Sequence, residues 1–197
     1  MSDVVKTTSR VIRAVVLVAW AMVIITAIAF YIDDPSRFSA RAIADFTLAF
    51  NTEIWLVYFV LSALRGFTLL PSTPLVLAGS VLFPDSPWLV LTISLAGILI
   101  SSSLIYFFSE ALGFTEYFEG KHPAKIERIR RLLEHPWGLA FVALWAFFPL
   151  VPTDVVCYVA GTAKMSFPKF IAAVFIGELV LCSIYVFSGG AIFRRFV

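Results

Sequence analysis

Charged residues are scarce in this chain. Only 14% of its 197 residues are charged, 60% are hydrophobic, and the net charge is +2. A soluble domain typically has about 25% charged and about 45–50% apolar residues. The composition therefore excludes an ordinary soluble domain. The chain also lacks a basic run interleaved with aromatic residues, the pattern that is typical of nucleic-acid binding. We expect an integral membrane protein with the length of one compact domain and no nucleic-acid partner.

Groups that perform chemistry are also few. The two cysteines, Cys157 and Cys182, lie in apolar stretches and are read as small buried hydrophobic residues. The two histidines, His122 and His135, lie in a charged segment without the spacing of metal ligands. The chain has no Gly-x-Ser-x-Gly elbow and no glycine-rich nucleotide loop. The sequence predicts no cofactor, no metal and no enzymatic activity.

Long hydrophobic runs are what the chain has in abundance. Residues 14–32, 88–108 and 170–187 each come close to the roughly 20 apolar residues that a spanning helix needs. The first run could be a cleaved signal peptide, but we favour a retained transmembrane helix because the rest of the chain is itself apolar. The basic segment 1–13 ahead of it predicts a cytoplasmic N-terminus.

Two further apolar regions are interrupted by prolines in the same pattern, a Pro-x-x-Pro followed by Ala-Gly. The copies are Pro71, Pro74, Ala78 and Gly79, and then Pro149, Pro152, Ala160 and Gly161. Each half, about residues 54–110 and 137–190, has the order short helix, bend, short helix, long helix. Because neither short run can span a bilayer alone, we expect two re-entrant hairpins.

Counting the crossings places the two hairpins on opposite faces of the membrane. The basic loop over 121–131 then lies in the cytoplasm, as the positive-inside rule requires. The predicted fold is an all-α integral membrane protein. It has an N-terminal transmembrane helix and interfacial segment over 1–53. An inverted repeat of two re-entrant helical hairpins, each followed by a spanning helix, covers 54–197. We expect a multi-pass protein of the cell membrane, the inner membrane if the source is bacterial. The count leaves Arg194 and Arg195 outside, against the rule, so the side of the C-terminus stays open.

The loop between the halves contains a predicted amphipathic helix. Ile126, Ile129, Leu132 and Leu133 share one face, and basic residues surround the other sides. Two interpretations stay open for this segment. The helix lies on the membrane surface with its basic residues near phosphates, or it is a solvated linker.

Charged residues within hydrophobic segments are costly, which makes them candidates for function. Arg65 lies in the first hairpin, Asp154 follows the second bend, and Glu178 lies in the middle of the last span. We predict that Glu178 carries a proton or balances the charge of Arg65, the alternative being a structural ion pair or a hydrogen bond between helices. For Arg65 the alternative is that its side chain extends to the interface.

Both bends have residues typical of a helix start. Thr73, Thr153 and Asp154 could simply cap the second short helix of each hairpin, with Pro74 at the first helical position. The free N–H groups of a helix start within the membrane would also suit a phosphate or carboxylate. The predicted substrate-binding residues are Arg65, Thr73, Thr153 and Asp154, and those predicted for proton coupling or charge balance are Glu178 and Asp154.

The two proline-rich regions resemble a known family. The segment FFPLVPTDVVCYVAGTAKMSFPKFIAAVFIGEL contains the Pro-x-x-Pro turn, the Ala-Gly, Met165 and a Phe-rich helix start with Gly177. In the first half, LLPSTPLVLAG is its counterpart. These motifs are similar to those of the DedA superfamily, also called the VTT-domain or SNARE-associated Golgi protein family, over roughly residues 54–190. Ala146 departs from the pattern where members usually carry an arginine, and Arg65 departs where bacterial members often carry acidic residues.

The resemblance implies two oppositely oriented re-entrant hairpins and a role in moving lipids across bilayers. In that family the lipids are phospholipids or undecaprenyl phosphate, in some members with dependence on the proton-motive force. The leading hypothesis is a lipid transporter, flippase or scramblase for phospholipid or polyprenyl-phosphate headgroups, with proton coupling left open. Its partners would be membrane lipids, and a homo-oligomer stays open. The alternatives are a small-solute or ion secondary transporter of the same architecture, and a non-transporting scaffold whose 121–135 helix recruits a partner.

Overall fold

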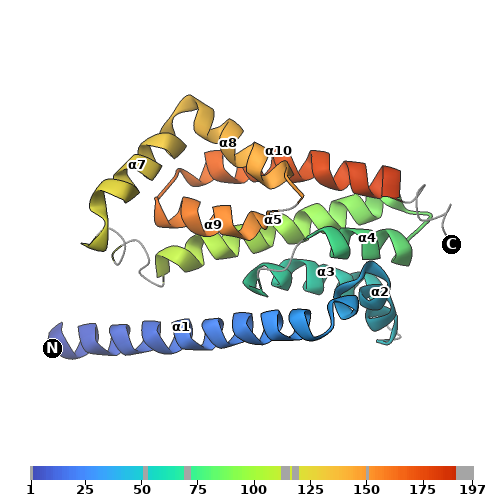
Figure 1. The fold of residues 1–197 in the computed structure, drawn as a ribbon, viewed down its shortest axis with the longest axis horizontal. Helices are drawn as coiled ribbons and strands as arrows, with labels where there is room; N and C mark the ends of the chain where they lie inside the picture. Colours follow the sequence, from blue (N-terminus) through green and yellow to red (C-terminus); the bar gives the residue numbers. More distant parts are fainter. Residues whose placement is uncertain are drawn as a thin grey trace.

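The computed structural model describes residues 2–50, 53–68, 72–111, 116, 120–149 and 151–189, with side chains from residue 13 onward except at 110 and 189. The regular elements in these ranges are all helices. Three long ones run side by side along the longest axis: α1 (Ser2–Asp33), α5 (Pro87–Ala111) and α10 (Phe167–Ile184) (Figure 1). Each contains a stretch that is long and apolar enough to cross a membrane. The chain is therefore an all-helical membrane protein.

Between the long helices lie the two proline-broken regions. The first comprises α3 (Ile54–Leu64), the 3₁₀ turn η2 (Arg65–Thr68) and α4 (Thr73–Leu82). The second comprises α8 (Pro136–Phe147) and α9 (Thr153–Thr162). The expected order of short helix, bend, short helix and long helix is thus present in both halves. Pro71, from the first Pro-x-x-Pro, lies outside the described residues.

The two broken regions pack in corresponding ways. Helix α3 packs along α5, the long helix of its own half, and α8 packs along α10 in the same manner. The second helix of each region crosses to the other half. Helix α9 lies on α5, and α4 lies against η3 (Tyr185–Gly189), the π-helical end of α10.

The Ala-Gly of each copy is explained by close packing. A Cβ on Gly79 would lie 2.3 Å from the Tyr58 hydroxyl oxygen of α3. A Cβ on Gly161 would lie 2.4 Å from the backbone oxygen of Tyr106 in α5. Such distances are far inside van der Waals contact, so both positions require glycine for the helices to approach this closely.

The interfacial segment folds into two short elements. Asp34 precedes the 3₁₀ turn η1 (Pro35–Phe38), and hydrogen bonds from Ser36 lower the pKa of its carboxyl group. The Ser39 hydroxyl accepts a hydrogen bond from the Ala42 N–H at 3.2 Å and caps α2 (Ala40–Leu48). Helix α2 packs against α4 through small residues, so the segment forms one wall of the protein.

The amphipathic helix of the central loop is α7 (Pro123–Glu134), and it packs on α8. Its apolar residues Ile126 and Leu133 are buried against the protein, whereas Leu132 of the same predicted face is 53% exposed. Its polar residues hold the turn between α9 and α10. Arg130 Nε donates to the Ala163 carbonyl at 3.0 Å, and Glu134 Oε1 accepts from the Ser166 N–H at 3.2 Å. This packing contradicts the solvated linker, and the membrane-surface location stays a prediction.

Candidate functional site: a buried charge cluster at the two helix breaks

Three charged residues from different elements meet in the interior. Arg65 begins η2, Asp154 lies in the first turn of α9, and Glu178 lies in α10. Arg65 Nη1 lies 3.4 Å from Asp154 Oδ2, across 89 positions of sequence. Arg65 is 8% exposed, and Asp154 and Glu178 are fully buried. The ion pair therefore joins the first helix break to the second.

Gly66 allows this contact to form. A Cβ at Gly66 would lie 2.0 Å from Ser101 Oγ of α5 and 3.0 Å from Asp154 Oδ1. Without a side chain, η2 can lie directly against α5 and place Arg65 beside Asp154. Ser101 is fully buried against this turn.

Thr153 connects the second break to the last long helix. Its hydroxyl donates a hydrogen bond to Glu178 Oε1 at 2.6 Å, and the Cys182 thiol lies 3.8 Å from Glu178 Oε2. The expected capping role of Thr153 and Asp154 is wrong. Pro152 occupies the N-cap of α9 without a side-chain hydrogen bond, and Thr153 is the first helical residue.

Thr73 lies apart from the cluster. Its hydroxyl donates to the Tyr185 hydroxyl at 3.4 Å, which ties the start of α4 to η3. It is not the helix cap that the sequence suggested, because Ser72 holds that position and Pro74 is the second helical residue. Four of the five predicted site residues, Arg65, Thr153, Asp154 and Glu178, are thus brought together, and Thr73 is not.

Some buried polar atoms of the cluster make no hydrogen bond within the described part of the chain. Removing an ion pair from water costs several kcal/mol per charge, and the cost is recovered only when the remaining lone pairs are also bonded. Asp154 Oδ1 and Ser101 Oγ are both buried and make no hydrogen bond to any described residue. The site therefore retains polar atoms that a guest group could engage. Within the described residues no group of three His, Cys, Asp or Glu side chains is placed to hold a metal ion.

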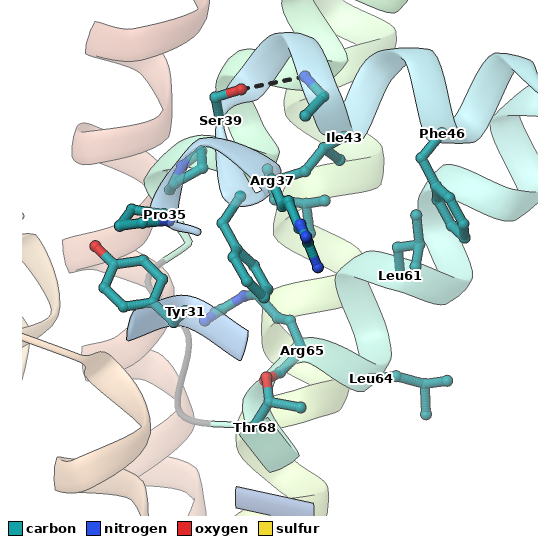
Figure 2. Close-up of a pocket in the computed structure, with 14 residues that line it drawn as sticks. Tyr31, Pro35, Arg37, Ser39, Ile43, Phe46, Leu61, Leu64, Arg65 and Thr68 are labelled. Carbon is teal, nitrogen blue, oxygen red and sulfur yellow. Dashed lines mark hydrogen bonds between the residues drawn. The ribbon is translucent and has the colours of Figure 1, made fainter. Parts of the chain in front are cut away.

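A cavity of about 610 Å³ opens beside Arg65. Its walls come from the end of α1 and from η1, α2, α3, η2 and α4, and Figure 2 shows Arg37 and Arg65 on different sides of it. The other lining residues are mainly apolar, among them Ile43, Phe46 and Leu61, and none of the lining residues is acidic. The cavity therefore combines an apolar wall with guanidinium groups, which suits an amphiphile with an anionic head.

Two contributors were not predicted from the sequence. Arg37 reaches the cavity from the interfacial segment, where an arginine next to Asp33 and Asp34 looks like an ordinary surface charge; it pairs with Asp34 at 3.1 Å. Ser101 contributes a buried hydroxyl that a stretch of three serines does not single out. Gly66 is the one local signal that another element lies close to this turn, because a glycine within an apolar run often marks a close approach of another backbone.

The VTT-domain family model matches residues 70–191. The chain belongs to the VTT-domain family. No curated protein and no solved structure matches the chain. The VTT domain contains Asp154 and Glu178, whereas Arg65, η1 and α2 lie ahead of the matched segment. Ala146, where the resemblance led us to expect an arginine, is fully buried in this domain, and a Cβ on Gly177 would lie 2.8 Å from it. The cation of the cluster therefore comes from outside the matched VTT domain.

Proposed function

We propose that this VTT-domain protein moves phospholipids or polyprenyl phosphates across the bilayer, with their headgroups passing the Arg65–Asp154 cluster. The observation that carries the proposal is the position of this buried pair. It joins the two helix breaks and borders a cavity of about 610 Å³ with apolar walls. A buried ionisable group within a membrane protein is a functional candidate because its burial is costly.

In this proposal the two broken regions are re-entrant hairpins that enter the membrane from opposite faces. Neither α3 with η2, nor α4, nor α8 is long enough to cross a bilayer. Their corresponding packing on α5 and α10 supports an inverted repeat. With a cytoplasmic N-terminus, α1, α5 and α10 are the crossings, and the cluster lies between the two leaflets.

The headgroup step is an exchange at Arg65. The guanidinium leaves the Asp154 carboxylate and binds the phosphate in a charge-assisted pair of hydrogen bonds. Asp154 then lacks its counter-ion and takes up a proton, which keeps the charge of the buried cluster constant. The N–H groups at the start of α9 add a partial positive charge on the same side, and Glu178 is held by Thr153. This exchange links headgroup passage to proton uptake at Asp154.

The test is transport in liposomes with and without a pH gradient. We expect the purified protein to move labelled phospholipid or polyprenyl phosphate between leaflets, and Arg65→Ala to lower the rate at least tenfold. Arg41→Ala, an exposed arginine on α2, is the matched control and retains the rate. The proposal is wrong if neither lipid moves, or if Arg65→Ala and Glu178→Gln both remain fully active. Solute flux without lipid movement would instead indicate a small-solute transporter.

A further inference from the structure

Helix α1 is less closely packed against the rest of the protein than the other two long helices. None of the residues in its spanning stretch is buried, against 56% in Pro87–Ser109 and 44% in Phe167–Ser188. One contact is Trp20, whose ring centroid lies 5.3 Å from that of Tyr158 in α9. The other is Tyr31, whose ring lies 5.6 Å from that of Phe38 in η1. Between these two aromatic contacts α1 approaches η2, but no described side chain in its spanning stretch is buried.

A groove of about 460 Å³ occupies that interval. One side of it is a single face of α1, formed by Ala19, Met22, Val23, Thr26, Ala27 and Phe30. Their spacing is that of one helical stripe. At 1.5 Å per residue this stripe is about 16 Å long. The opposite side includes Phe38 and Thr68, and none of the lining residues is charged.

The groove adjoins the Arg65 cavity. Phe38 and Thr68 line both spaces. Moving inward from α1, a guest would meet an apolar stripe, then these two residues, and then the wall that carries Arg65. No acidic residue lines either space. Arg37 pairs with Asp34 and Asp33, at 3.1 and 3.9 Å. The other cation of the cavity lining is Arg65, which pairs with Asp154 on the side away from the lining residues.

We propose that the groove between α1 and η2 binds one hydrocarbon chain of an anionic membrane lipid whose headgroup lies at Arg65. This inference rests on the proposed lipid transport and adds the route by which the lipid leaves the bilayer. Because α1 is a candidate spanning helix, the groove lies at membrane depth beside lipid chains. The apolar groove is followed by a guanidinium group, just as the hydrocarbon chain of such a lipid is followed by its anionic head. A cationic head is excluded because the arginine would repel it.

The first experiment maps the chain directly. The full-length protein is placed in vesicles containing phosphatidic acid with a diazirine in one acyl chain, illuminated, digested and analysed by mass spectrometry. We expect labelling of Met22, Val23 and Phe30 at least fivefold above that of Ile25 and Ile32 on the other faces of α1. Arg65→Ala should remove this preference. The same measurement is made with Arg65→Ala and with a neutral diacylglycerol that carries the diazirine. Equal labelling of all faces of α1 would overturn the proposal. Groove labelling that is the same in the variant and with the neutral probe would also overturn it, because the groove would then contain only surrounding bilayer lipid.

The second experiment fills the groove. Ala27→Trp places an indole in the stripe, whereas Ala29→Trp places the same group on an exposed face that lines neither space. We expect Ala27→Trp to lower groove labelling and lipid transport at least tenfold, and Ala29→Trp to change both less than twofold. Equal elution profiles and melting temperatures of the two variants show that both fold. If the two variants transport lipid equally, the groove is not the route.

The two proposals fail in different ways. If the wild-type protein moves no lipid but its groove is labelled in an Arg65-dependent manner, the proposed transport is wrong and the lipid site stands. If the wild-type protein moves lipid and the groove shows no preference, the transport proposal stands and the groove is wrong.

Discussion

The two broken regions share one order of elements but differ in how firmly their bends are held. In the second region, Trp145 Nε1 donates to the Pro152 carbonyl at 3.4 Å, and Arg130 and the Tyr106 hydroxyl hold the turn after α9. In the first, Arg65 begins a 3₁₀ turn that borders a cavity. The carboxylates of the cluster line neither this cavity nor the groove beside α1, whereas Arg65, although largely buried, borders the cavity. An incoming anion would therefore meet Arg65 before it meets the carboxylates.

The largest effect is expected where the two regions touch. Arg65→Ala leaves Asp154 and Glu178 as buried carboxylates without a counter-ion, and breaking a buried pair by removing one partner costs about 3–5 kcal/mol. We expect a lower melting temperature together with the loss of lipid transport. The double variant Arg65→Met, Asp154→Leu removes both charges and should be more stable than Arg65→Ala. If the double variant is destabilised by the sum of the single changes, the two residues do not act as a pair.

The second effect concerns the contact of the first break with α5. In Gly66→Ala the new Cβ runs into Ser101 Oγ and into the Ile105 side chain, at 2.0 and 2.7 Å in the present geometry. Overpacking of this kind costs about 1–3 kcal/mol. Ser101→Ala in the same chain removes the closer atom and should restore part of the lost stability, as measured by thermal unfolding in detergent. A Gly66→Ala variant as stable as the wild type would show that η2 can move away from α5 without cost.

These two sites show what the sequence can predict and what it cannot. The helix breaks can be predicted locally, because prolines interrupt the apolar runs. Arg65, Asp154 and Glu178 can also be singled out locally, because a charge within an apolar run is costly to bury. The partner of Arg65, Asp154, lies 89 positions away. It cannot be predicted locally, because the pairing depends on how the two broken regions pack against each other. The first break contributes the cation, and the second half contributes the carboxylates, Asp154 from α9 and Glu178 from α10.

Other features depend on packing that has no local signature. The cavity exists because η1 and α2 fold back over α3 and α4, which hydrophobic periodicity does not encode. The apolar face of α7 was recognised from its spacing, but the protein surface on which it packs was not. Thr73 and Thr153 are each the first residue of the second short helix in their region, yet only Thr153 reaches the cluster. The repeat in sequence therefore does not guarantee a repeat of roles.

A third comparison separates those two threonines. Thr153→Val removes the donor to Glu178, a buried carboxylate, and should cost about 1–3 kcal/mol, the range for leaving a buried polar group unsatisfied. Thr73→Val removes a longer, half-buried bond to Tyr185 and should cost less than about 1 kcal/mol. Thermal unfolding of both variants, with transport measured in parallel, tests the order. Equal losses would mean that Glu178 does not depend on Thr153.

The smallest expected effect tests whether the second bend must be fixed. Arg130→Ala removes the hydrogen bond to the Ala163 carbonyl at the end of α9, a part-buried contact worth about 1 kcal/mol. Arg131→Ala is the matched control, because its side chain is 78% exposed and pairs only with Glu127 in the same helix among the described residues. If a rigid carboxylate side positions Asp154 for the exchange, Arg130→Ala should slow lipid transport two- to threefold while Arg131→Ala leaves it unchanged. Faster transport in Arg130→Ala would mean the opposite, that the tether restrains a movement of α9 on which the exchange depends.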